Sequence, residues 1–237
     1  MLNKNKLGEK YMSSLEIEDG IDIYPVYQPI YSLEKMRIVG YEALIRSQKG
    51  FSPGELFNKA EKEGRTVEFD IECINSSILN ISKICGVLFL NIRPSTLMWL
   101  SRNNNNRLNI NIPANKVVLE ITEVEEISDM EGFIKVLTNL RKLGYRYSID
   151  DIATGFNRLH LVLGSAPDYI KLDGPIIKDC DKYPNKCSVI KHLVAIGKDI
   201  GSVVIAENIE NSSELQIVKE LGVTYAQGFY LGKPSAI

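Results

Sequence analysis

The sequence predicts a TIM-type (β/α)8 barrel, an α/β fold, with an early antiparallel strand. Strand-like apolar runs alternate with helical patterns, and the number of strands approaches eight. The chain has 237 residues, and such barrels commonly reach about 200–250 residues as one domain. Only Leu33 and Glu34 separate the first two runs. A turn this short favours an antiparallel hairpin, because a parallel crossover needs a dozen or more residues.

The predicted strands are short runs rich in apolar and β-branched residues. A doubly wound open sheet is the alternative architecture, but no Gly-x-Gly-x-x-Gly motif follows an early strand. The barrel is therefore favoured. The predicted strands cover residues 23–32, 35–45, 87–91, 116–121, 145–150, 168–172, 202–206 and 224–227.

Helices are predicted where apolar residues recur at steps of three and four. The clearest start signal is Ser52 as N-cap, Pro53 as first helical residue and Glu55 as third, and Gly64 ends this helix. The run Asn103–Asn106 is predicted to be a loop. The predicted helices cover residues 53–63, 67–83, 129–143, 157–163, 188–198 and 212–221, with a single turn at 97–100.

The composition narrows the classes of function. The net charge is −2, which gives no electrostatic basis for binding long nucleic acid or an anionic membrane. An anionic ligand would therefore need a metal ion or a few placed cations. Residues 1–21 are polar and are predicted to be a tail or the end of a linker, whereas residues 22–237 form the domain. No apolar stretch approaches the ~20 residues of a membrane span, so we expect a cytoplasmic protein.

The cysteines show no Cys-x-x-Cys spacing and are expected to be reduced and structural. Zinc is disfavoured because His160 and His192 are the only histidines, and neither lies near a cysteine at ligand spacing. The cysteines are Cys73, Cys85, Cys180 and Cys187.

Polar side chains recur where apolar runs end, and a barrel would gather them at the carboxyl ends of its strands. Asp150 and Asp151 close one run, and two adjacent carboxylates call for a compensating cation. Alternatively, Asp151 caps the next helix in an Asx-type turn. Lys171 closes another run, and the remaining polar residues of this kind are Glu42, Asn91, Glu120 and Glu207.

Each of these residues also has a purely structural interpretation. Glu42 could face solvent on an edge strand, Asn91 could end its strand in a turn, and Lys171 could extend along the barrel mouth to reach water. Residues 120 and 122 share one strand face. We therefore expect Glu120 to reach the site and Glu123 to support it or hold a loop.

Carboxylates and one amide oxygen, without histidine or cysteine, are the ligands that Mg²⁺ or Mn²⁺ prefers. One or two such ions activate water and bind phosphoryl oxygens. Lys171 could hold a phosphate or orient the attacking water. The residues therefore indicate metal-assisted hydrolysis of a phosphoester and leave the substrate open.

The sequence also resembles the EAL-domain family, bacterial phosphodiesterases that linearise cyclic di-GMP to pGpG. The resemblance covers about residue 22 to the C-terminus and keeps the order and spacing of the family's motifs. The matching segments are Gln28-Pro29-Ile30, Glu42-Ala43-Leu44, Leu90-Asn91, Glu120-Ile-Thr-Glu123, Asp150-Asp151, Lys171-Leu-Asp173, Ala206-Glu-Asn-Ile-Glu210 and Gln227-Gly228-Phe229.

The resemblance implies a role for each matching position. It implies a first Mg²⁺ or Mn²⁺ on Glu42, Asn91, Glu120 and Asp150, and a second on Asp151. Lys171 would orient or help to deprotonate the water, and Glu207 would bind metal or act as base. Glu123 would brace the loop after Asp151. Gln227 would contact water or substrate, Arg46 a substrate phosphate, and the other predicted substrate or supporting residues are Gln28, Leu44, Asp173 and Glu210. Family members commonly form homodimers through the loop after Asp151.

The chain departs from the family pattern beside the site. Ile152 replaces a phenylalanine, Ala153 replaces a glycine, and Gly174 stands where the family often has arginine. The metal ligands themselves are intact, so we expect an active enzyme, whereas the changes in the loop that positions Asp151 are expected to affect the second metal and the rate. The alternatives are a catalytically weak or inactive cyclic di-GMP receptor that signals through a protein partner, and a barrel hydrolase of another phosphodiester.

Overall fold

A computed structural model gives the structure of residues 23–103, 114–152 and 158–237. The predicted tail at residues 1–21, Asn104–Asn106 of the predicted loop and Ala153 lie outside these residues. None of the described helices is long and apolar enough to cross a membrane.

The strands form a closed barrel in chain order, which confirms the predicted fold. β1 is antiparallel to both β2 and β8, and the pairs from β2–β3 to β7–β8 are parallel. The early antiparallel strand is therefore also confirmed. The strands are β1 (Ile23–Ser32), β2 (Arg37–Ser47), β3 (Val87–Ile92), β4 (Val117–Ile121), β5 (Arg146–Ile149), β6 (Tyr169–Leu172), β7 (Val203–Ala206) and β8 (Tyr225–Ala226).

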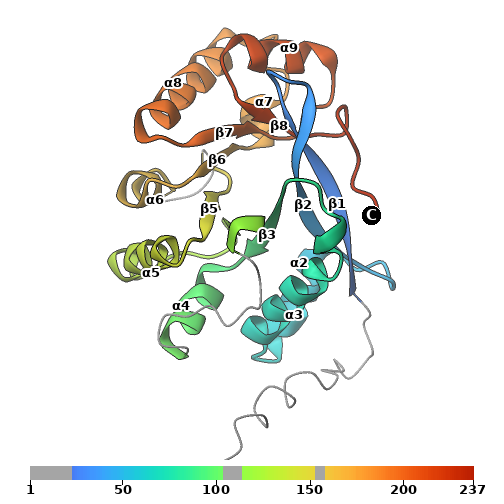
Figure 1. Ribbon diagram of the computed structural model, residues 1–237, viewed down its shortest axis with the longest axis vertical. Helices are drawn as coiled ribbons and strands as arrows, with labels where there is room; N and C mark the ends of the chain where they lie inside the picture. The colour runs from blue at the N-terminus through green and yellow to red at the C-terminus, as the bar shows by residue number, and fades with distance from the viewer. Residues whose placement is uncertain (1–22, 104–113, 153–157) are drawn as a thin grey trace, which may run out of the picture.

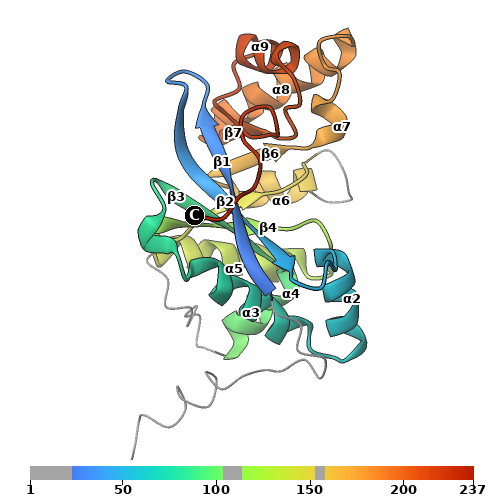
Figure 2. The same cartoon turned by 90° about the vertical axis from the view of Figure 1, so that its right-hand side faces the viewer.

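Helices lie outside the barrel, and the β1–β2 hairpin extends beyond the other strands (Figures 1 and 2). The C-terminal segment returns along β1, where Tyr27 and Ser235 exchange two backbone hydrogen bonds of 2.8 and 3.1 Å. The α-helices are α2 (Pro53–Lys62), α3 (Thr66–Ile78), α4 (Pro94–Asn103), α5 (Met130–Lys142), α6 (Arg158–Ser165), α7 (Gly174–Ile177), α8 (Pro184–Ile200) and α9 (Ser212–Glu220).

The predicted start of α2 is confirmed. The Ser52 hydroxyl accepts a hydrogen bond from the Glu55 amide while the Glu55 carboxylate accepts one from the Ser52 amide. This reciprocal pair satisfies two amides that the first helical turn leaves without partners. At the other end of the helix, Gly64 has a φ of +67°, which a glycine adopts without steric cost.

The structure corrects several predicted helices. The single helix expected at residues 67–83 is instead α3 followed by a separate 3₁₀ turn at Ile81–Lys83, because Asn80 leaves the helical conformation. α4 is longer than the expected single turn and includes Asn103, and α8 begins earlier than expected. Each begins at a proline, Pro94 or Pro184, a residue suited to the first helical position. The short helix α7 was not predicted.

An apolar layer inside the barrel supports the polar residues above it. Phe89, Val118, Tyr169 and Ile205 are buried together with Ile30 in one cluster. Side chains two positions apart point to the same face of a strand. The next inward positions along these strands are therefore Asn91, Glu120, Lys171 and Glu207, and the geometry of the strands delivers four predicted site residues to one place.

Candidate active site

Lys171 lies at the centre of the predicted site and is 1% exposed. Its Nζ lies 2.7 Å from Glu207 Oε1, 3.3 Å from Glu42 Oε2 and 3.8 Å from Asp150 Oδ1, and it also pairs with Glu120. A buried ammonium group is stable only when opposite charges compensate it. Lys171 therefore does not extend to solvent, and it joins carboxylates from four other strands or strand ends.

Two amide side chains complete the network around Glu42. Gln227 Nε2 donates to Glu42 Oε2 at 2.5 Å and to Glu207 Oε1 at 3.0 Å, and Asn91 Nδ2 donates to Glu42 Oε1 at 3.0 Å. Glu42 is itself buried, so it does not face solvent on an edge strand. Because the amide nitrogen of Asn91 is already used, its oxygen is the atom that can bind a cation.

The buried charges shift the pKa values of the cluster in opposite directions. Burial raises the pKa of Glu120 well above its usual value, and the neighbouring Glu42 charge adds to this effect. Burial also raises the pKa of Glu207. Burial acts in the same direction on Glu42, but the Lys171 charge and the amide hydrogen bonds outweigh it and lower its pKa. Burial opposes the charge of Lys171, yet the surrounding carboxylates raise its pKa well above the ordinary value.

Asp150 and Asp151 form a tight turn after β5. Asp151 has a φ of +48°, a left-handed conformation that aspartate tolerates better than most residues, and its amide donates to Asp150 Oδ1 at 3.1 Å. Burial and then the Asp150 charge raise the pKa of Asp151 to about 7. Residues 153–157 lie outside the described part of the chain, which resumes at Arg158 at the start of α6, so the alternative in which Asp151 caps the next helix stays a prediction.

The residues fit one or two divalent cations. A carboxylate oxygen from each of Asp150, Asp151 and Glu207 lies within 4.8 Å of the other two. Glu120 Oε2 and both carboxylate oxygens of Asp173 are buried without a hydrogen-bond partner. Such groups are costly unless a cation or a proton compensates them. Hard oxygen ligands of this kind suit Mg²⁺, Mn²⁺ or Ca²⁺.

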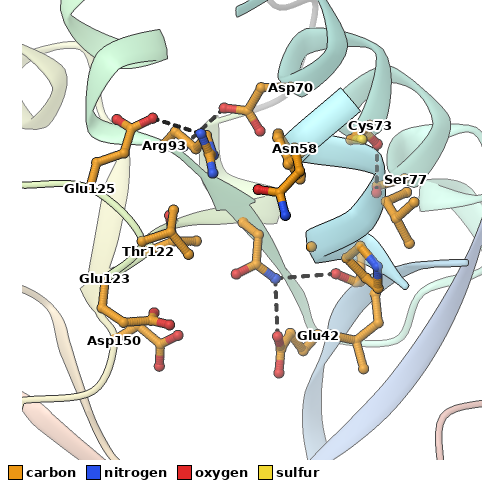
Figure 3. A pocket seen from close by; sticks show the side chains of 18 of the residues that line it. Glu42, Asn58, Asp70, Cys73, Ser77, Arg93, Thr122, Glu123, Glu125 and Asp150 are labelled. Atoms are coloured by element: carbon orange, nitrogen blue, oxygen red, sulfur yellow. Dashed lines mark hydrogen bonds and ion pairs between the residues drawn. The ribbon is translucent and has the colours of Figure 1, made fainter. Parts of the chain in front are cut away.

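A cavity of about 550 Å³ opens from this cluster towards α2 and α3. Glu42 and Asp150 line its barrel end (Figure 3), and Asn91 also lines the cavity. At its helical end Arg93 lies between Asp70 and Glu125, with a 2.9 Å ion pair from Nη1 to Glu125 Oε1. The Arg93 guanidinium also lies 4.4 Å from the centre of the Phe57 ring. The cavity therefore carries an arginine and an aromatic face at some distance from the carboxylate cluster.

This helical end of the cavity was not predicted from the sequence. Asp70 is buried in α3, and its Oδ2 accepts a hydrogen bond of 2.9 Å from the Arg93 amide. A carboxylate inside an otherwise apolar helix face is a signal that could have been noticed. Arg93, Glu125 and Phe57 carry no such signal, because they come from three unrelated segments.

The structure divides the predicted substrate residues into two groups. Leu44 and Arg46 line the cavity, and Arg46 Nη1 donates to the Ile45 carbonyl at 2.8 Å. The other three do not line it. Gln28 is buried and donates to the Gly232 carbonyl at 3.1 Å, Asp173 is buried after β6, and Glu210 is exposed.

Glu123 and the altered loop lie at the edge of the cluster. Glu123 lines the cavity beside Asp150 (Figure 3), which is consistent with the supporting role expected for it. Ile152 is 7% exposed and packs into the main core, and its amide donates to the Lys171 carbonyl at 3.4 Å. The isoleucine is thus accommodated as a core residue.

Comparison with known proteins assigns the family. The EAL domain family model matches residues 14–234. The chain belongs to the EAL-domain family. The crystal structure of BlrP1 from Klebsiella pneumoniae with manganese and cyclic di-GMP is similar to this EAL chain, with 30% identity and a TM-score of 0.78, over 90% of this chain and 56% of that one. A standalone EAL protein from Vibrio cholerae, 24% identical with a TM-score of 0.78 over 94% of each chain, supports the fold alone.

The curated relatives are longer proteins. The signaling protein YkoW of Bacillus subtilis is 28% identical in an alignment that covers 88% of this chain and 28% of YkoW. The cyclic di-GMP phosphodiesterase PdeA of Borreliella burgdorferi is 26% identical in an alignment that covers 99% of this chain and 36% of PdeA. The chain thus spans less than a third of one relative and little more than a third of the other.

Proposed function

We propose that this EAL chain is a metal-dependent phosphodiesterase that hydrolyses cyclic di-GMP to linear pGpG. The observation that carries the proposal is the gathering of the carboxylates around Lys171 at the mouth of a cavity that ends in a second cationic group. The names of relatives such as PdeA and the cyclic di-GMP bound to BlrP1 support the same substrate.

Divalent ions would be held by the carboxylate cluster. Glu42, Asn91, Glu120 and Asp150 would hold a first ion, and Asp151 would hold a second, with Glu207 available to either. When bound, Mg²⁺ or Mn²⁺ supplies Lewis-acid polarisation of a phosphoryl oxygen and makes water a better nucleophile at neutral pH. The buried oxygens without partners, described above, support this assignment.

The chain's own residues position the reactants. Lys171 is a cation with protons to donate, so it would orient the attacking oxygen and neutralise negative charge that develops on the phosphoryl group. Glu207 and Gln227 lie beside it and would accept from and donate to the same water. Arg46, at the cavity wall, would bind a phosphate oxygen of the substrate.

The length of the cavity suits a dinucleotide better than a small phosphoester. One phosphate would lie at the cluster and the distal nucleotide would reach Arg93 and Phe57. An aromatic face and a planar guanidinium suit a nucleobase, because bases stack on either group. A simple phosphomonoester would leave this end of the cavity unused.

We further propose that the chain forms a homodimer through α6. Leu159 and Leu163 project from this helix with exposed fractions of 48% and 63%. They occupy positions four apart, and residues at this spacing share one helix face. Multi-angle light scattering should report a dimer for the wild type and a monomer for Leu163→Glu.

The direct test is turnover of cyclic di-GMP with Mg²⁺ or Mn²⁺, with the products separated by chromatography. The matched variant is Glu42→Gln, which keeps the size of the side chain but removes its charge and replaces one accepting oxygen with an NH2 donor. We expect pGpG from the wild type and at least about a 10²-fold lower rate from the variant. A panel with cyclic di-AMP and a linear dinucleotide tests the substrate class.

The outcomes separate the alternatives. Binding of cyclic di-GMP without turnover would replace the enzyme with a receptor that signals through a partner. Turnover of another phosphodiester in place of cyclic di-GMP would retain the chemistry and change the substrate. Absence of both binding and turnover would contradict the proposal.

A further inference from the structure

The carboxylates of the site outnumber its cations within the residues that the structure describes. Lys171 pairs directly with Glu42, Glu120, Asp150 and Glu207. It makes no such pair with Asp151 or Glu123. A second cation serves that other side of the cluster, and it is Arg158.

Arg158 is the first residue of α6 and is 4% exposed. Its Nη2 donates to the Thr122 carbonyl at 2.7 Å, and its Nη1 is buried without a hydrogen-bond partner. Thr122 immediately precedes Glu123 in the segment that follows β4. A guanidinium group with an unpartnered N–H is costly to bury unless negative charges surround it.

The charges that surround Arg158 belong to the site. Glu123 lies beside Asp150 in the cavity wall (Figure 3). Burial alone lowers the pKa of Arg158, and the charges of Glu123, Asp150 and Asp151 act against that effect. The pKa of Glu123 is raised by burial and by Asp150 and is lowered by Arg158. The hydrogen bond to the Thr122 carbonyl places the buried Arg158 guanidinium at the residue before Glu123, on the Glu123 side of the cluster.

The cluster is thus divided between two buried cations. Lys171 compensates the carboxylates inside the barrel and its charge also acts on Asp151, whereas Arg158 compensates Glu123 at the edge. Asp150, which pairs with Lys171, lies beside Glu123 (Figure 3). The group that could bind a divalent ion at that edge is Asp150, Asp151 and Glu207. A positive charge fixed beside this group reduces the negative potential that would attract an ion.

We propose that Arg158 is a buried counter-charge beside Glu123 and the Asp150–Asp151 turn that weakens the binding of a second divalent ion there. The inference rests on the proposed function in taking divalent ions as the cofactor. It predicts that the two ions bind with clearly different affinities, and that the weaker one is limited by Arg158. An arginine with only a packing role would instead support the ligands, and its loss would weaken ion binding.

The test is calorimetric titration of the full chain with Mn²⁺ in the absence of substrate. Arg158→Gln keeps an N–H donor for the Thr122 carbonyl but removes the charge, and Arg158→Lys keeps the charge. Arg158→Met is a second neutral variant, whose apolar chain suits the buried position. Arg141→Gln is the matched control, because Arg141 on α5 also donates to backbone carbonyls, at 3.2 Å to Ser165 and 2.6 Å to Ala166, away from the cluster.

We expect the neutral variants that remain folded by circular dichroism to bind the weaker ion about tenfold or more tightly than the wild type. Arg158→Lys and Arg141→Gln should keep the wild-type affinities. A wild type that binds one ion and a neutral variant that binds two would support the proposal equally.

Unchanged or weaker binding by both neutral variants would overturn the inference and leave the proposed function standing. If Arg158→Lys bound Mn²⁺ as much more tightly as the neutral variants do, the inference would be overturned as well, because the charge at this position would then have no effect. No Mn²⁺ binding by any variant, the wild type included, would overturn the inference and contradict the metal dependence. A wild type that binds Mn²⁺ but does not turn over cyclic di-GMP would contradict only the enzymatic activity.

Discussion

The two ends of the cavity each hold a cation, but in different settings. At the barrel end, Lys171 is almost fully buried among carboxylates carried by strands. At the helical end, Arg93 is partly exposed, pairs with one carboxylate, Glu125, and lies over an aromatic ring. The first arrangement is costly to disturb because removal of the cation leaves several buried anions. The second can change at smaller cost, because water reaches the groups that remain.

Under the proposed function, the barrel end would carry out the chemistry and the helical end would bind a remote part of the substrate. Loss of a group that acts on the reacting atoms lowers kcat, whereas loss of a group that binds a remote part of the substrate raises KM. Substitutions at the two ends should therefore have separable effects.

The largest effect is expected for Lys171→Met. Removal of the ammonium leaves buried carboxylates without their cation, which costs about 3–5 kcal/mol of unfolding free energy. Turnover should fall by about 10²–10³-fold because a positioned donor is lost. Rates and thermal melts with and without Mn²⁺ measure both effects, and the ion should stabilise the variant more than the wild type.

The matched control is Lys182→Met, which removes an exposed ion pair with Asp179. It should change neither turnover nor melting appreciably, because exposed pairs contribute about 0–1 kcal/mol. Turnover retained in Lys171→Met would contradict the assignment of chemistry to the barrel end.

The next effect is a pH dependence that arises at the helical end. Burial raises the pKa of Asp70 to about 6. An acid with a raised pKa in the folded state contributes stability below its unfolded pKa, and this contribution is lost as the pH rises through about 6. Over pH 4–7 the loss approaches about 3 kcal/mol, from a shift of about two pKa units.

Asp70→Asn should remove that dependence, since the asparagine oxygen can still accept from the Arg93 amide. Urea denaturation in metal-free buffer should show that the unfolding free energy of the variant rises relative to that of the wild type between pH 4 and pH 7. If the difference in unfolding free energy between the two proteins stayed constant over this pH range, Asp70 would not titrate there.

A smaller effect is expected for Arg93→Ser. We expect KM to rise about tenfold with kcat nearly unchanged, because under the proposed function Arg93 would contact only a remote part of the substrate. Arg93→Lys keeps the charge but loses the planar group over Phe57, so its KM should be intermediate. Steady-state kinetics measure both constants. A fall in kcat at constant KM would show that Arg93 acts on the reacting atoms instead.

The same two ends differ in how far the sequence predicted them. The barrel end follows from the alternation of side chains on strands: Glu120 and Lys171 lie two positions beyond Val118 and Tyr169, in strands that an apolar pattern locates. Their approach within one cluster then follows from closure of the barrel. The resemblance to the EAL family supplied the individual roles.

The helical end and Arg158 could not be predicted in this way. Arg93, Glu125 and Phe57 lie on three segments whose distances depend on tertiary packing rather than on a repeat. Arg158 received no role from the sequence, because no pattern indicated that the start of α6 would bury this residue against the Thr122 carbonyl. The length of α4 was underestimated for the same reason. The apolar pattern at Leu97–Leu100 indicated only one turn of this helix.

The smallest effect concerns packing at the barrel end, where Gly174 follows β6. A Cβ at this position would lie 2.8 Å from Nδ2 of Asn208, whose own φ is +54°. Gly174→Ala should therefore cost about 1 kcal/mol. Asn208→Gly keeps the left-handed conformation and removes the obstructing amide, so the cost of the alanine should disappear in the double variant. A double-mutant cycle by chemical denaturation measures this coupling. Additive effects would show that Asn208 moves aside freely, and that this edge of the site, unlike the charged cluster beside it, tolerates substitution.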